Sequence, residues 1–359
     1  MKTLAIDCRM ARMSGIGVYL RNLAPLCMGL LAGSVKFRLL GYDGAFRVPK
    51  GPSWEAAPFD APIYSIAEQY RMPPLLRGKD ALWLPHYPVP LVARTPLVAT
   101  IHDVAHLALP DLFTGVQKVY ARLMFQAVRR KAAELLFVSE FSRQEFLRRV
   151  GAPRGGMTVT HNGVDQDWFK LPLAHEPARP PYFLAIGNIK PHKNIHLLCQ
   201  TFAHIAEQCD ADLVLAGEYS GFRSAEASTE ILAAICPGRI KFTGPVEQEE
   251  LVRLMCGATA LVFPSRYEGF GLPPLEALAA GVPVIASNIP PVREVCGEHA
   301  RYFSPDSEEQ LAQAMLETLA FSPQDRRQRG EAGRAHARQF SWVHTAETTA
   351  QVLKKALEA

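Results

Sequence analysis

Hydrophobic residues in this chain follow two patterns that alternate from one end to the other. Short, nearly uninterrupted hydrophobic runs are separated by longer stretches in which hydrophobic residues recur every three or four positions. The short runs are typical of buried parallel strands, and the longer periodicity is typical of helices that pack on them. Their alternation predicts parallel sheets with helices on both faces, which is the α/β class.

In the first half of the chain the two patterns are regular enough to place elements. Strands are predicted at 3–8, 36–42, 61–66, 81–86, 96–103, 134–139 and 157–162, and helices near 16–31, 114–132 and 141–150. The pattern then stops at residues 171–181, which are rich in proline and have no periodicity. This stretch is interpreted as a linker between domains.

After the linker the alternation begins again. Strands are predicted at 182–188, 211–218, 239–245, 258–265, 282–287 and 300–305, and helices near 194–208, 225–235, 247–256, 274–280, 308–319, 324–338 and 342–357. A chain of 359 residues is also too long for one ordinary core. We therefore expect two doubly wound domains, 1–170 and 182–340, followed by a terminal helix at 341–359. Two such domains are expected to face each other across a cleft lined by the carboxyl ends of their strands.

Composition narrows the class of protein further. The chain is 48% hydrophobic and 21% charged, as in soluble globular proteins. Asp7 and Arg9 interrupt the first hydrophobic run, which argues against a signal peptide, and no run reaches the roughly 20 apolar residues of a membrane span. The seven cysteines form no Cys-x-x-Cys pair and are interpreted as reduced thiols of a cytoplasmic protein.

Charge is distributed unevenly along the chain. The first 170 residues contain 22 Lys and Arg against 13 Asp and Glu, a net charge of +9, whereas the remainder has 17 against 22, a net charge of −5. The basic residues concentrate at 118–131 and 143–154, in predicted helices that also carry Leu123, Phe125, Phe146 and Leu147. Solvated helix faces are the ordinary explanation. The alternative is peripheral contact with an anionic surface such as the inner membrane. Nucleic acid is disfavoured, because no known nucleic-acid-binding module accompanies the basic residues.

The strongest candidate site is the stretch "RYEGFGLPPLEALAAGVPVIAS", which follows the predicted strand at 258–265. Gly269 and Gly271 permit a sharp turn around Phe270, and a helix is expected to begin at Leu272, before two prolines. The backbone amides of such a loop and helix start suit a diphosphate. Glu268 is expected to face the cleft, and Glu276 to lie in the first helical turn and accept hydrogen bonds from vicinal hydroxyls. Stabilisation of the helix dipole is the simpler alternative for Glu276.

A second candidate is the stretch "AIGNIKPHKN", which also follows a predicted strand. Gly187 ends that strand, and Lys193 comes just before the next helix, with Lys190 and His192 close by. A lysine at this place can neutralise a phosphate leaving group, although most surface lysines are merely solvated.

Two stretches of the first domain complete the expected cleft. In "SGIGVYLRN", Gly15 and Gly17 permit close approach of a phosphate or an acceptor, but Leu20 occupies the position of the third glycine of a dinucleotide fingerprint. In "TIHDVAH", His102 and Asp103 follow a strand. A single histidine is more often structural, but a His-Asp pair at a strand end favours a catalytic role.

Taken together, these motifs resemble glycosyltransferase family 4, whose members are retaining enzymes of the GT-B fold. The resemblance extends over nearly the whole chain, and the two glutamates match the family's E-x7-E signature. It implies that Glu268 contacts the donor sugar, Glu276 the ribose and Lys193 the diphosphate, and that His102 lies beside the transferred sugar. It also implies that Pro245 and Val246 contact the base through the backbone. The terminal helix is expected to pack back on the N-terminal domain.

The chain departs from the family pattern in the loop after the strand-ending Gly187. Many members have an arginine where this chain has Asn188, and the subgroup with a G-T-L-x-P-R-K-N loop has an arginine where this chain has His192. Neutralisation of the diphosphate is therefore expected to depend on Lys193, with Lys190 or Arg266 as helpers. That subgroup is common among transferases of mannose or deoxyhexoses in bacterial surface-polysaccharide synthesis.

GDP-mannose is accordingly the first expected donor, and a dTDP- or UDP-sugar is the second. The expected acceptor is a hydroxyl of a glycan or of a polyprenyl-diphosphate-linked glycan. No metal or other cofactor is expected. The expected location is the cytoplasm, with contact at the cytoplasmic face of the inner membrane.

Three other functions remain open at this stage. Asp165 with Asp167, and Asp210 with Asp212, spell the D-x-D motif of metal-dependent sugar transferases, although both pairs fall where turns are expected. A sugar-nucleotide epimerase of the same fold is a second alternative. A protein that binds the nucleotide sugar without turning it over is the third.

Overall fold

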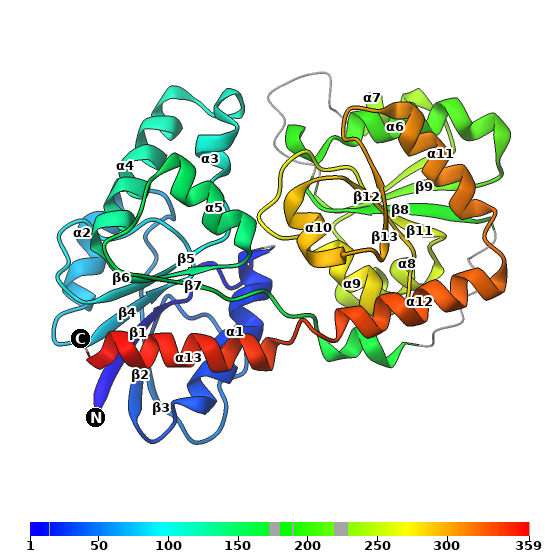
Figure 1. Ribbon diagram of the computed structural model, residues 1–359. Helices are drawn as coiled ribbons and strands as arrows, with labels where there is room; N and C mark the ends of the chain where they lie inside the picture. Colours follow the sequence, from blue (N-terminus) through cyan, green and yellow to red (C-terminus); the bar gives the residue numbers. More distant parts are fainter. Residues whose placement is uncertain (14, 172–179, 189, 219–228, 359) are drawn as a thin grey trace. The chain divides into compact units, whose positions relative to one another are not determined.

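The computed structural model describes residues 1–13, 15–171, 180–188, 190–218 and 229–358, which form two compact units (Figure 1). The first unit comprises Met1–Gly163 and Phe340–Ala359, and the second comprises Val164–Gln339. The predicted linker at 171–181 lies mostly outside the described residues, so the predicted domain boundaries stay predictions.

The first unit contains a seven-stranded sheet in the order β3-β2-β1-β4-β5-β6-β7, and every neighbouring pair of strands is parallel. The strands are β1 (Lys2–Asp7), β2 (Val35–Leu40), β3 (Ser53–Ala57), β4 (Ala81–Leu84), β5 (Leu97–Ile101), β6 (Ala132–Phe137) and β7 (Gly156–Val159). The central strands are buried on both faces, which explains why they appear in the sequence as continuous hydrophobic runs.

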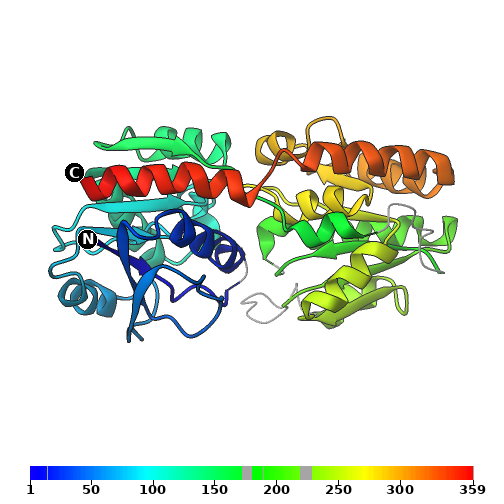
Figure 2. The same ribbon diagram turned by 90° about the horizontal axis from the view of Figure 1, so that it is seen from below.

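Helices cover both faces of this first sheet (Figures 1 and 2). They are α1 (Ile16–Leu30), α2 (Ile66–Leu75), α3 (Ala105–Ala108), α4 (Gly115–Lys131), α5 (Glu140–Arg149) and α13 (Trp342–Glu358), with the 3-10 helix η1 (Pro110–Leu112). Side chains of α2, α4 and α5 share one hydrophobic core with alternate residues of the strands, such as Leu82 and Leu84 of β4. Helices α1 and α13 contact each other, and α13 also contacts β1, β4, β5 and β6.

The second unit repeats this architecture with a six-stranded parallel sheet in the order β10-β9-β8-β11-β12-β13. The strands are β8 (Tyr182–Ile186), β9 (Asp212–Ala216), β10 (Ile240–Gly244), β11 (Ala260–Phe263), β12 (Val284–Ser287) and β13 (Ala300–Phe303). Strand order reverses between β8 and β11, as it does between β1 and β4 in the first unit.

The helices of the second unit are α6 (Ile195–Ile205), α7 (Thr229–Ile235), α8 (Gln248–Gly257), α9 (Leu272–Ala280), α10 (Pro290–Cys296), α11 (Glu308–Leu319) and α12 (Pro323–Ala337), with the 3-10 helices η2 (Gln166–Lys170), η3 (Pro191–Lys193) and η4 (Ala206–Gln208). Helices α6, α7 and α11 share a hydrophobic core with the sheet. Helix α12 packs on α9. The buried Arg334 of α12 donates hydrogen bonds to the carbonyls of Ala279 and Ala280, which have no partner within α9 because they lie at its C-terminal end.

The α/β class, the two doubly wound sheets and the return of the terminal helix to the N-terminal unit are confirmed. In Figure 2, α13 runs along the first unit beside its sheet, although it follows the whole second unit in sequence. Tyr19 of α1 and Trp342 of α13 meet edge to face with their ring centroids 6.2 Å apart. Buried aromatic and aliphatic contacts of this kind explain why the last helix leaves the second unit.

One stretch of the first unit was predicted wrongly. Residues 61–66, predicted as a strand, form a turn that leads into α2, and the third strand is β3 instead. Pro62 has no amide hydrogen for a sheet, and Tyr64 has a backbone φ of 60°, so neither fits an extended ladder. Helices α2, α3 and α10 are missing from the predicted elements, and the first residues of the helix predicted near 225–235 lie outside the described part of the chain.

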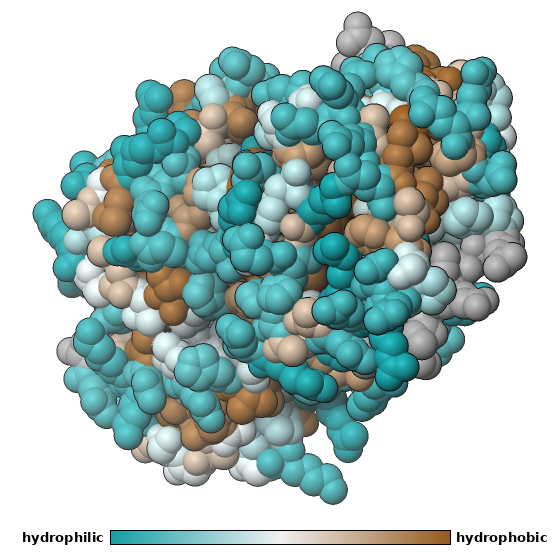
Figure 3. All heavy atoms as spheres, turned by 45° about the vertical axis from the view of Figure 1, so that its right-hand side comes forward, coloured by the Kyte–Doolittle hydropathy of each residue, from teal (hydrophilic) through white to brown (hydrophobic). Residues whose placement is uncertain are grey.

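Within the described part of the chain, no helix is long and apolar enough to cross a membrane. Hydrophilic side chains cover most of the face shown in Figure 3, with hydrophobic side chains in smaller groups between them.

Candidate active site

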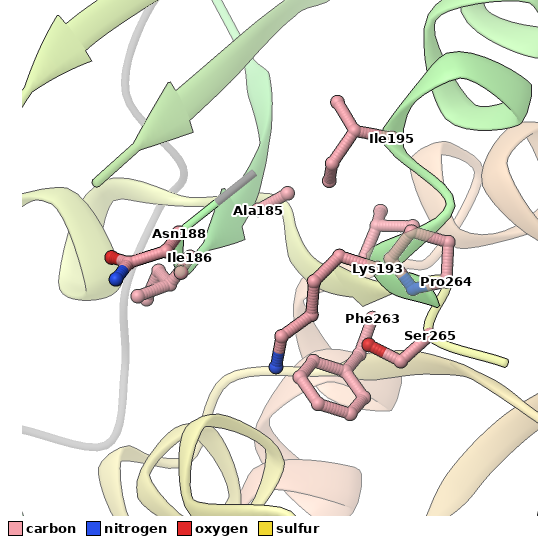
Figure 4. A pocket seen from close by; sticks show the side chains of 10 residues that line it. Ala185, Ile186, Asn188, Lys193, Ile195, Phe263, Pro264 and Ser265 are labelled. Atoms are coloured by element: carbon pink, nitrogen blue, oxygen red, sulfur yellow. The ribbon is translucent and has the colours of Figure 1, made fainter. Parts of the chain in front are cut away.

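The reversal of strand order between β8 and β11 creates a small pocket in the second unit. Loops leave these two neighbouring strands in opposite directions, so the carboxyl ends of the strands are left open to a ligand. The pocket is lined by Ala185, Ile186, Gly187, Asn188, Lys193, Ile195, Val262, Phe263, Pro264 and Ser265 (Figure 4). Two predicted donor-binding residues, Gly187 and Asn188, therefore lie at the end of β8 beside Lys193.

Lys193 forms an ion pair in this place. Its Nζ lies 2.6 Å from Glu268 Oε1 and 5.5 Å from the centre of the Phe263 ring, along which the side chain extends in Figure 4. The side chains of Lys193 and Glu268 are 21% and 15% exposed, so the pair remains accessible to a ligand. The structure thus brings together two of the four predicted catalytic residues.

The loops that hold this pair have a defined local structure. Asn194 follows Lys193 in the left-handed conformation, with φ 57° and ψ 31°, which asparagine tolerates better than most residues. Its side-chain amide donates to Pro305 O at 2.8 Å, and Arg266 N donates to His192 O at 2.8 Å. The turn between η3 and α6 is therefore tied to the loop that carries Glu268.

The neighbouring basic residues contribute less charge to this site than Lys193 does. Burial lowers the pKa of His192 to about 4, against the opposing effect of Glu268, so its ring is neutral at pH 7. Arg266 pairs with Asp306 at 2.9 Å, and Lys190 is exposed. Among the described residues that line the pocket, Lys193 carries the only positive charge.

The glycine-rich loop turns sharply before α9. Gly271 has φ 140°, a conformation that other residues rarely adopt, and Phe270 is buried. Helix α9 begins at Leu272 as predicted, and its next two residues are prolines, which have no amide hydrogen. Backbone donors for an anion must therefore come from the loop and from Leu272 rather than from the whole first turn.

The position predicted for Glu276 within the helix was wrong. Because α9 begins at Leu272, the first turn contains no acidic residue and Glu276 lies in the second turn. A helix-dipole role fades beyond the first turn, so that simpler alternative loses its support. Glu276 is half-buried, and removal of its carboxyl from water raises its pKa to about 7, with the charge of Asp165 adding to the shift.

Three glycines line up at the ends of neighbouring strands. Gly187 N donates to Ala216 O at 2.9 Å, and Gly217 N donates to Gly244 O at 3.0 Å. A Cβ atom on Gly217 would lie only 2.3 Å from Gly187 O, so a side chain there would displace the loop that follows β8. Gly217 is missing from the predicted site residues, although its place directly after a strand was a usable signal. Pro245 and Val246 follow β10, with Pro245 exposed and Val246 half-buried.

The predicted residues of the first unit have identifiable structural roles. A Cβ atom on Gly17 would lie 2.8 Å from Ala11 O, so close packing of α1 on the preceding loop is sufficient to require glycine there. Gly15 precedes α1 with φ 66°. Asp103 Oδ1 accepts a hydrogen bond from Ala105 N at 2.8 Å and so stabilises the turn that leads into the short helix α3.

His102 follows β5 at the carboxyl edge of the first sheet. Its Nε2 lies 3.0 Å from Pro85 O, and the Tyr19 ring meets it edge-on with centroids 5.0 Å apart. Burial lowers the pKa of His102 to about 4, so the ring is neutral at pH 7. Because a carbonyl only accepts, Nε2 carries the proton, and the other ring nitrogen is left to accept a hydrogen bond.

Three of the four aspartates in the two D-x-D pairs make local hydrogen bonds or ion pairs. Asp165 Oδ1 accepts from Asp167 N at 3.0 Å and caps η2, and Asp167 pairs with Lys170 at 2.6 Å. Asp212 pairs with Arg239 at 3.0 Å and with Lys241 at 2.6 Å. Within the described ranges no cluster of three or more His, Cys, Asp or Glu residues is arranged to hold a metal ion.

Comparison with known proteins gives two family matches. The family described as Glycosyltransferase Family 4 matches residues 13–168, and the family described as Glycosyl transferases group 1 matches residues 172–336.

Individual proteins agree with these family matches. O-antigen chain mannosyltransferase B of Escherichia coli is 30% identical over 72% of this chain and 70% of its own length, and O-antigen chain mannosyltransferase RfbU of Salmonella typhimurium is 29% identical over 70% and 69%. Among solved structures, Anabaena Alr3699/HepE in complex with UDP-glucose superposes with a TM-score of 0.76 at 19% identity, over 99% of this chain and 100% of the other. At that identity the likeness shows the fold alone, which is GT-B.

Proposed function

The chain belongs to glycosyltransferase family 4, and on this basis we propose that it transfers a hexose from a nucleoside-diphosphate sugar to a hydroxyl of a glycan acceptor. Enzymes of this family retain the anomeric configuration and typically need no metal ion. The observation that carries the proposal for this chain is the Lys193–Glu268 pair at the switch point between β8 and β11.

In this proposal Lys193 neutralises the departing diphosphate. Charge grows on the leaving phosphate as the bond to the sugar breaks, and a cation fixed beside that charge lowers the barrier. The pocket lining offers Lys193 for this purpose, and the backbone of the loop at 269–272 is proposed to supply amide donors. Gly187 and Asn188 complete the phosphate side of the site.

Glu268 is proposed to hold the sugar while it reacts. Before the donor binds, its carboxylate neutralises Lys193, which keeps both side chains in place. When the diphosphate takes over Lys193, the carboxylate becomes available to accept hydrogen bonds from sugar hydroxyls. The ion pair is thus a preformed state of the donor site.

Glu276 is proposed to accept hydrogen bonds from the ribose, and the backbone at Pro245 and Val246 to contact the base. Burial of the Glu276 carboxylate raises its pKa to about 7. Hydrogen bonds from the ribose hydroxyls would compensate for the free-energy cost of removing this carboxylate from water. His102, whose ring is neutral, is proposed to lie beside the transferred sugar and to accept from a hydroxyl rather than to neutralise charge.

Mannose from GDP-mannose is the proposed donor sugar, because the similar proteins from Escherichia coli and Salmonella typhimurium are O-antigen mannosyltransferases. A lipid-linked glycan of bacterial surface-polysaccharide synthesis is the corresponding acceptor. The alternative donor is a UDP- or dTDP-sugar, in support of which a structural relative is known in complex with UDP-glucose.

The donor is tested by measuring thermal stability with GDP, UDP and TDP, because a ligand that binds only the folded chain raises its melting temperature. We expect a shift with GDP. Transfer from GDP-mannose to a glycoside acceptor, followed by NMR of the product, then reports the anomeric configuration. A shift with UDP or TDP and none with GDP contradicts the proposed donor, and a product of inverted configuration contradicts the mechanism.

We also propose that α4 docks on an anionic membrane. Val116, Val119 and Leu123 recur along α4 and are 80%, 71% and 53% exposed, so the packing of the first unit leaves this stripe uncovered. Arg122 and Arg130 of the same helix are also exposed. A stripe of this kind inserts into the headgroup region while its arginines meet anionic lipids.

The other predicted basic segment does not support docking. Arg148 and Arg149 both pair with Glu145, and Phe125 and Phe146 are buried in the core. Lys131 donates hydrogen bonds to the carbonyls of Leu91 and Ala93. The membrane proposal is therefore confined to the outer face of α4.

A further inference from the structure

The first unit has a switch point of its own, between β1 and β4, and charged and aromatic residues gather there. Asp7 is the last residue of β1, His86 follows β4, and Asp103 follows β5. Because the carboxyl ends of parallel strands meet at one edge, the topology brings these residues together at the edge where α/β sheets bind ligands. This cluster is separate from the Lys193–Glu268 site, which lies in the second unit.

A buried ionic network fixes the base of this cluster. Arg9 Nη2 lies 2.6 Å from Asp7 Oδ2 and 3.2 Å from Glu68 Oε2, and Tyr120 donates to Glu68 Oε1 at 2.7 Å. Although burial raises it, the hydrogen bonds from His86 and Arg9 hold the pKa of Asp7 well below its ordinary value. Arg9 is thus held between two carboxylates, and a buried network of this kind forms a rigid base for a binding site.

His86 has one ring nitrogen that this network does not use. Its Nε2 lies 3.2 Å from Asp7 Oδ2, and because an ionised carboxylate only accepts, Nε2 is the donor. Its Nδ1 is buried and has no hydrogen-bond partner among the described residues. A buried polar atom without a partner is costly, and it marks a place where a ligand hydroxyl or a water is missing.

Tyr64 lies next to His86 and is the exposed member of the cluster. Its ring centroid is 6.1 Å from that of His86, 5.7 Å from that of Tyr87 and 6.3 Å from that of His106. The residue is 38% exposed. Burial against the protein, with the charges of Asp103 and Glu68 nearby, raises the pKa of its hydroxyl.

The backbone of Tyr64 is strained. Among the described residues other than glycine, Tyr64 and Asn194 have positive φ, and Asn194 is of a type that tolerates it whereas tyrosine is not. Such strain persists where the surrounding structure and a function hold it in place. His86 Nδ1 is buried in this structure, and the ring of the strained residue lies beside the His86 ring.

We propose that Tyr64 and His86 form the subsite that recognises the acceptor sugar. The Tyr64 ring packs against the apolar face of the sugar, and His86 Nδ1 accepts a hydrogen bond from one of its hydroxyls. An aromatic face beside carboxylates and a ring nitrogen matches a pyranose, which has both apolar C–H faces and polar edges. This inference rests on the proposed function, since it assigns acceptor recognition to the first unit.

The test compares Tyr64→Ala, Tyr64→Gly and His86→Gln with Tyr70→Ala as a matched control, because Tyr70 is an exposed tyrosine on the neighbouring helix α2. Binding of octyl α-mannoside, octyl α-glucoside and octyl α-galactoside is measured by saturation-transfer NMR. We expect ring-proton signals from at least one glycoside with the wild-type protein and with Tyr70→Ala. The signals should be lost with the Tyr64 and His86 variants.

In transfer assays the same variants should raise the KM for the glycoside about tenfold, which corresponds to about 1.4 kcal/mol. Hydrolysis of the donor without acceptor, and the thermal shift with nucleoside diphosphate, should be unchanged. Tyr64→Gly should also melt at a higher temperature than Tyr64→Ala, because both variants lose the ring contacts and only glycine relieves the strain at this φ. Equal loss of acceptor binding in these two variants of different stability assigns the loss to the missing ring and not to weaker folding.

Two results overturn the inference: wild-type protein that binds none of the glycosides, or Tyr64 variants that bind them as well as Tyr70→Ala does. A different result would refute the proposed function. In that case the protein neither hydrolyses nor transfers the sugar of any sugar nucleotide, whether or not it binds the glycosides.

Discussion

Lys193 Nζ lies 2.6 Å from Glu268 Oε1, and this ion pair joins two loops whose residues are 75 positions apart in the sequence. The pair lies where β8 and β11 diverge, beside the pocket at their carboxyl ends. In the proposed function, the lysine of this pair serves the diphosphate and the glutamate serves the sugar of a single donor.

Loss of the lysine should impair catalysis and donor binding together. Lys193→Ala is expected to lower the transfer rate by at least about a hundredfold, the size of the effect of one lost charge-stabilising donor. Lys241→Ala is the control, because Lys241 also pairs with a carboxylate, on the edge strand β10. Steady-state kinetics with the donor sugar measure both. A near-normal rate for Lys193→Ala refutes the role of Lys193.

The two glutamates should fail in different ways. Glu268→Gln is expected to lower kcat while the affinity for free nucleoside diphosphate stays the same, because its proposed partner is the sugar. Glu276→Gln is expected to weaken that affinity by about 1.5–3 kcal/mol, the range for a hydrogen bond to a charged group. Calorimetric titration of both variants with the diphosphate separates the two roles. Equal losses of affinity show that the assignment is wrong.

Glu276 should also make stability depend on pH. With a folded-state pKa of about 7, above the ordinary glutamate value of about 4.3, the folded chain holds more protons than the unfolded chain between these values. Stability should therefore fall as pH rises through this window. Glu276→Gln removes the charge, so its melting temperature relative to the wild type should be higher at pH 8 than at pH 5.

Asp165→Asn provides the matched variant for this pH effect. It removes the negative charge that adds to the pKa shift of Glu276, while asparagine can still accept from Asp167 N. The fall in stability should then be smaller than in the wild type and should occur at lower pH. The melting temperatures of the wild type, Glu276→Gln and Asp165→Asn are measured from pH 5 to pH 8. If the three melting temperatures change with pH in the same way, Glu276 does not titrate in this range.

Transfer activity should survive EDTA. Three of the four carboxylates in the two D-x-D pairs, those of Asp165, Asp167 and Asp212, are here engaged with Asp167 N, Lys170, Arg239 and Lys241. Charge on the diphosphate is assigned to Lys193 and to loop amides instead. Activity with the identified donor is compared before and after chelation. Loss on chelation that Mg²⁺ or Mn²⁺ restores means that a metal ion takes part.

Membrane docking should depend on α4 alone. Substitution of Val116, Val119 and Leu123 by serine, or of Arg122 and Arg130 by glutamine, is expected to abolish co-sedimentation with vesicles containing phosphatidylglycerol at low salt. Arg148→Gln with Arg149→Gln is the control, because both arginines pair with Glu145. High salt should weaken wild-type binding, since the lipid headgroups act through their charge. Wild-type protein that stays in the supernatant at low salt excludes the docking surface.

The sequence by itself determined the layers of this protein and most of its strands. Hydrophobic periodicity is a local property, and buried parallel strands such as β4, β5, β8 and β11 express it without help from distant residues. The loops at 187–193 and 268–272 were located for the same reason, because each directly follows such a strand. The E-x7-E signature then identified the family.

Only the tertiary structure decided which of these residues meet. Asp7 and Arg9 were noticed only as interruptions of a hydrophobic run, yet Asp7 meets His86 because β1 and β4 are neighbours in the sheet, and Arg9 meets Glu68 of α2. The turn at Tyr64 was predicted as a strand, since local hydrophobicity carries no information about a backbone held in the left-handed region. The pairing of Lys193 with Glu268 likewise depends on strand order. Strand order is set by packing across the whole sheet, which no short stretch of sequence contains.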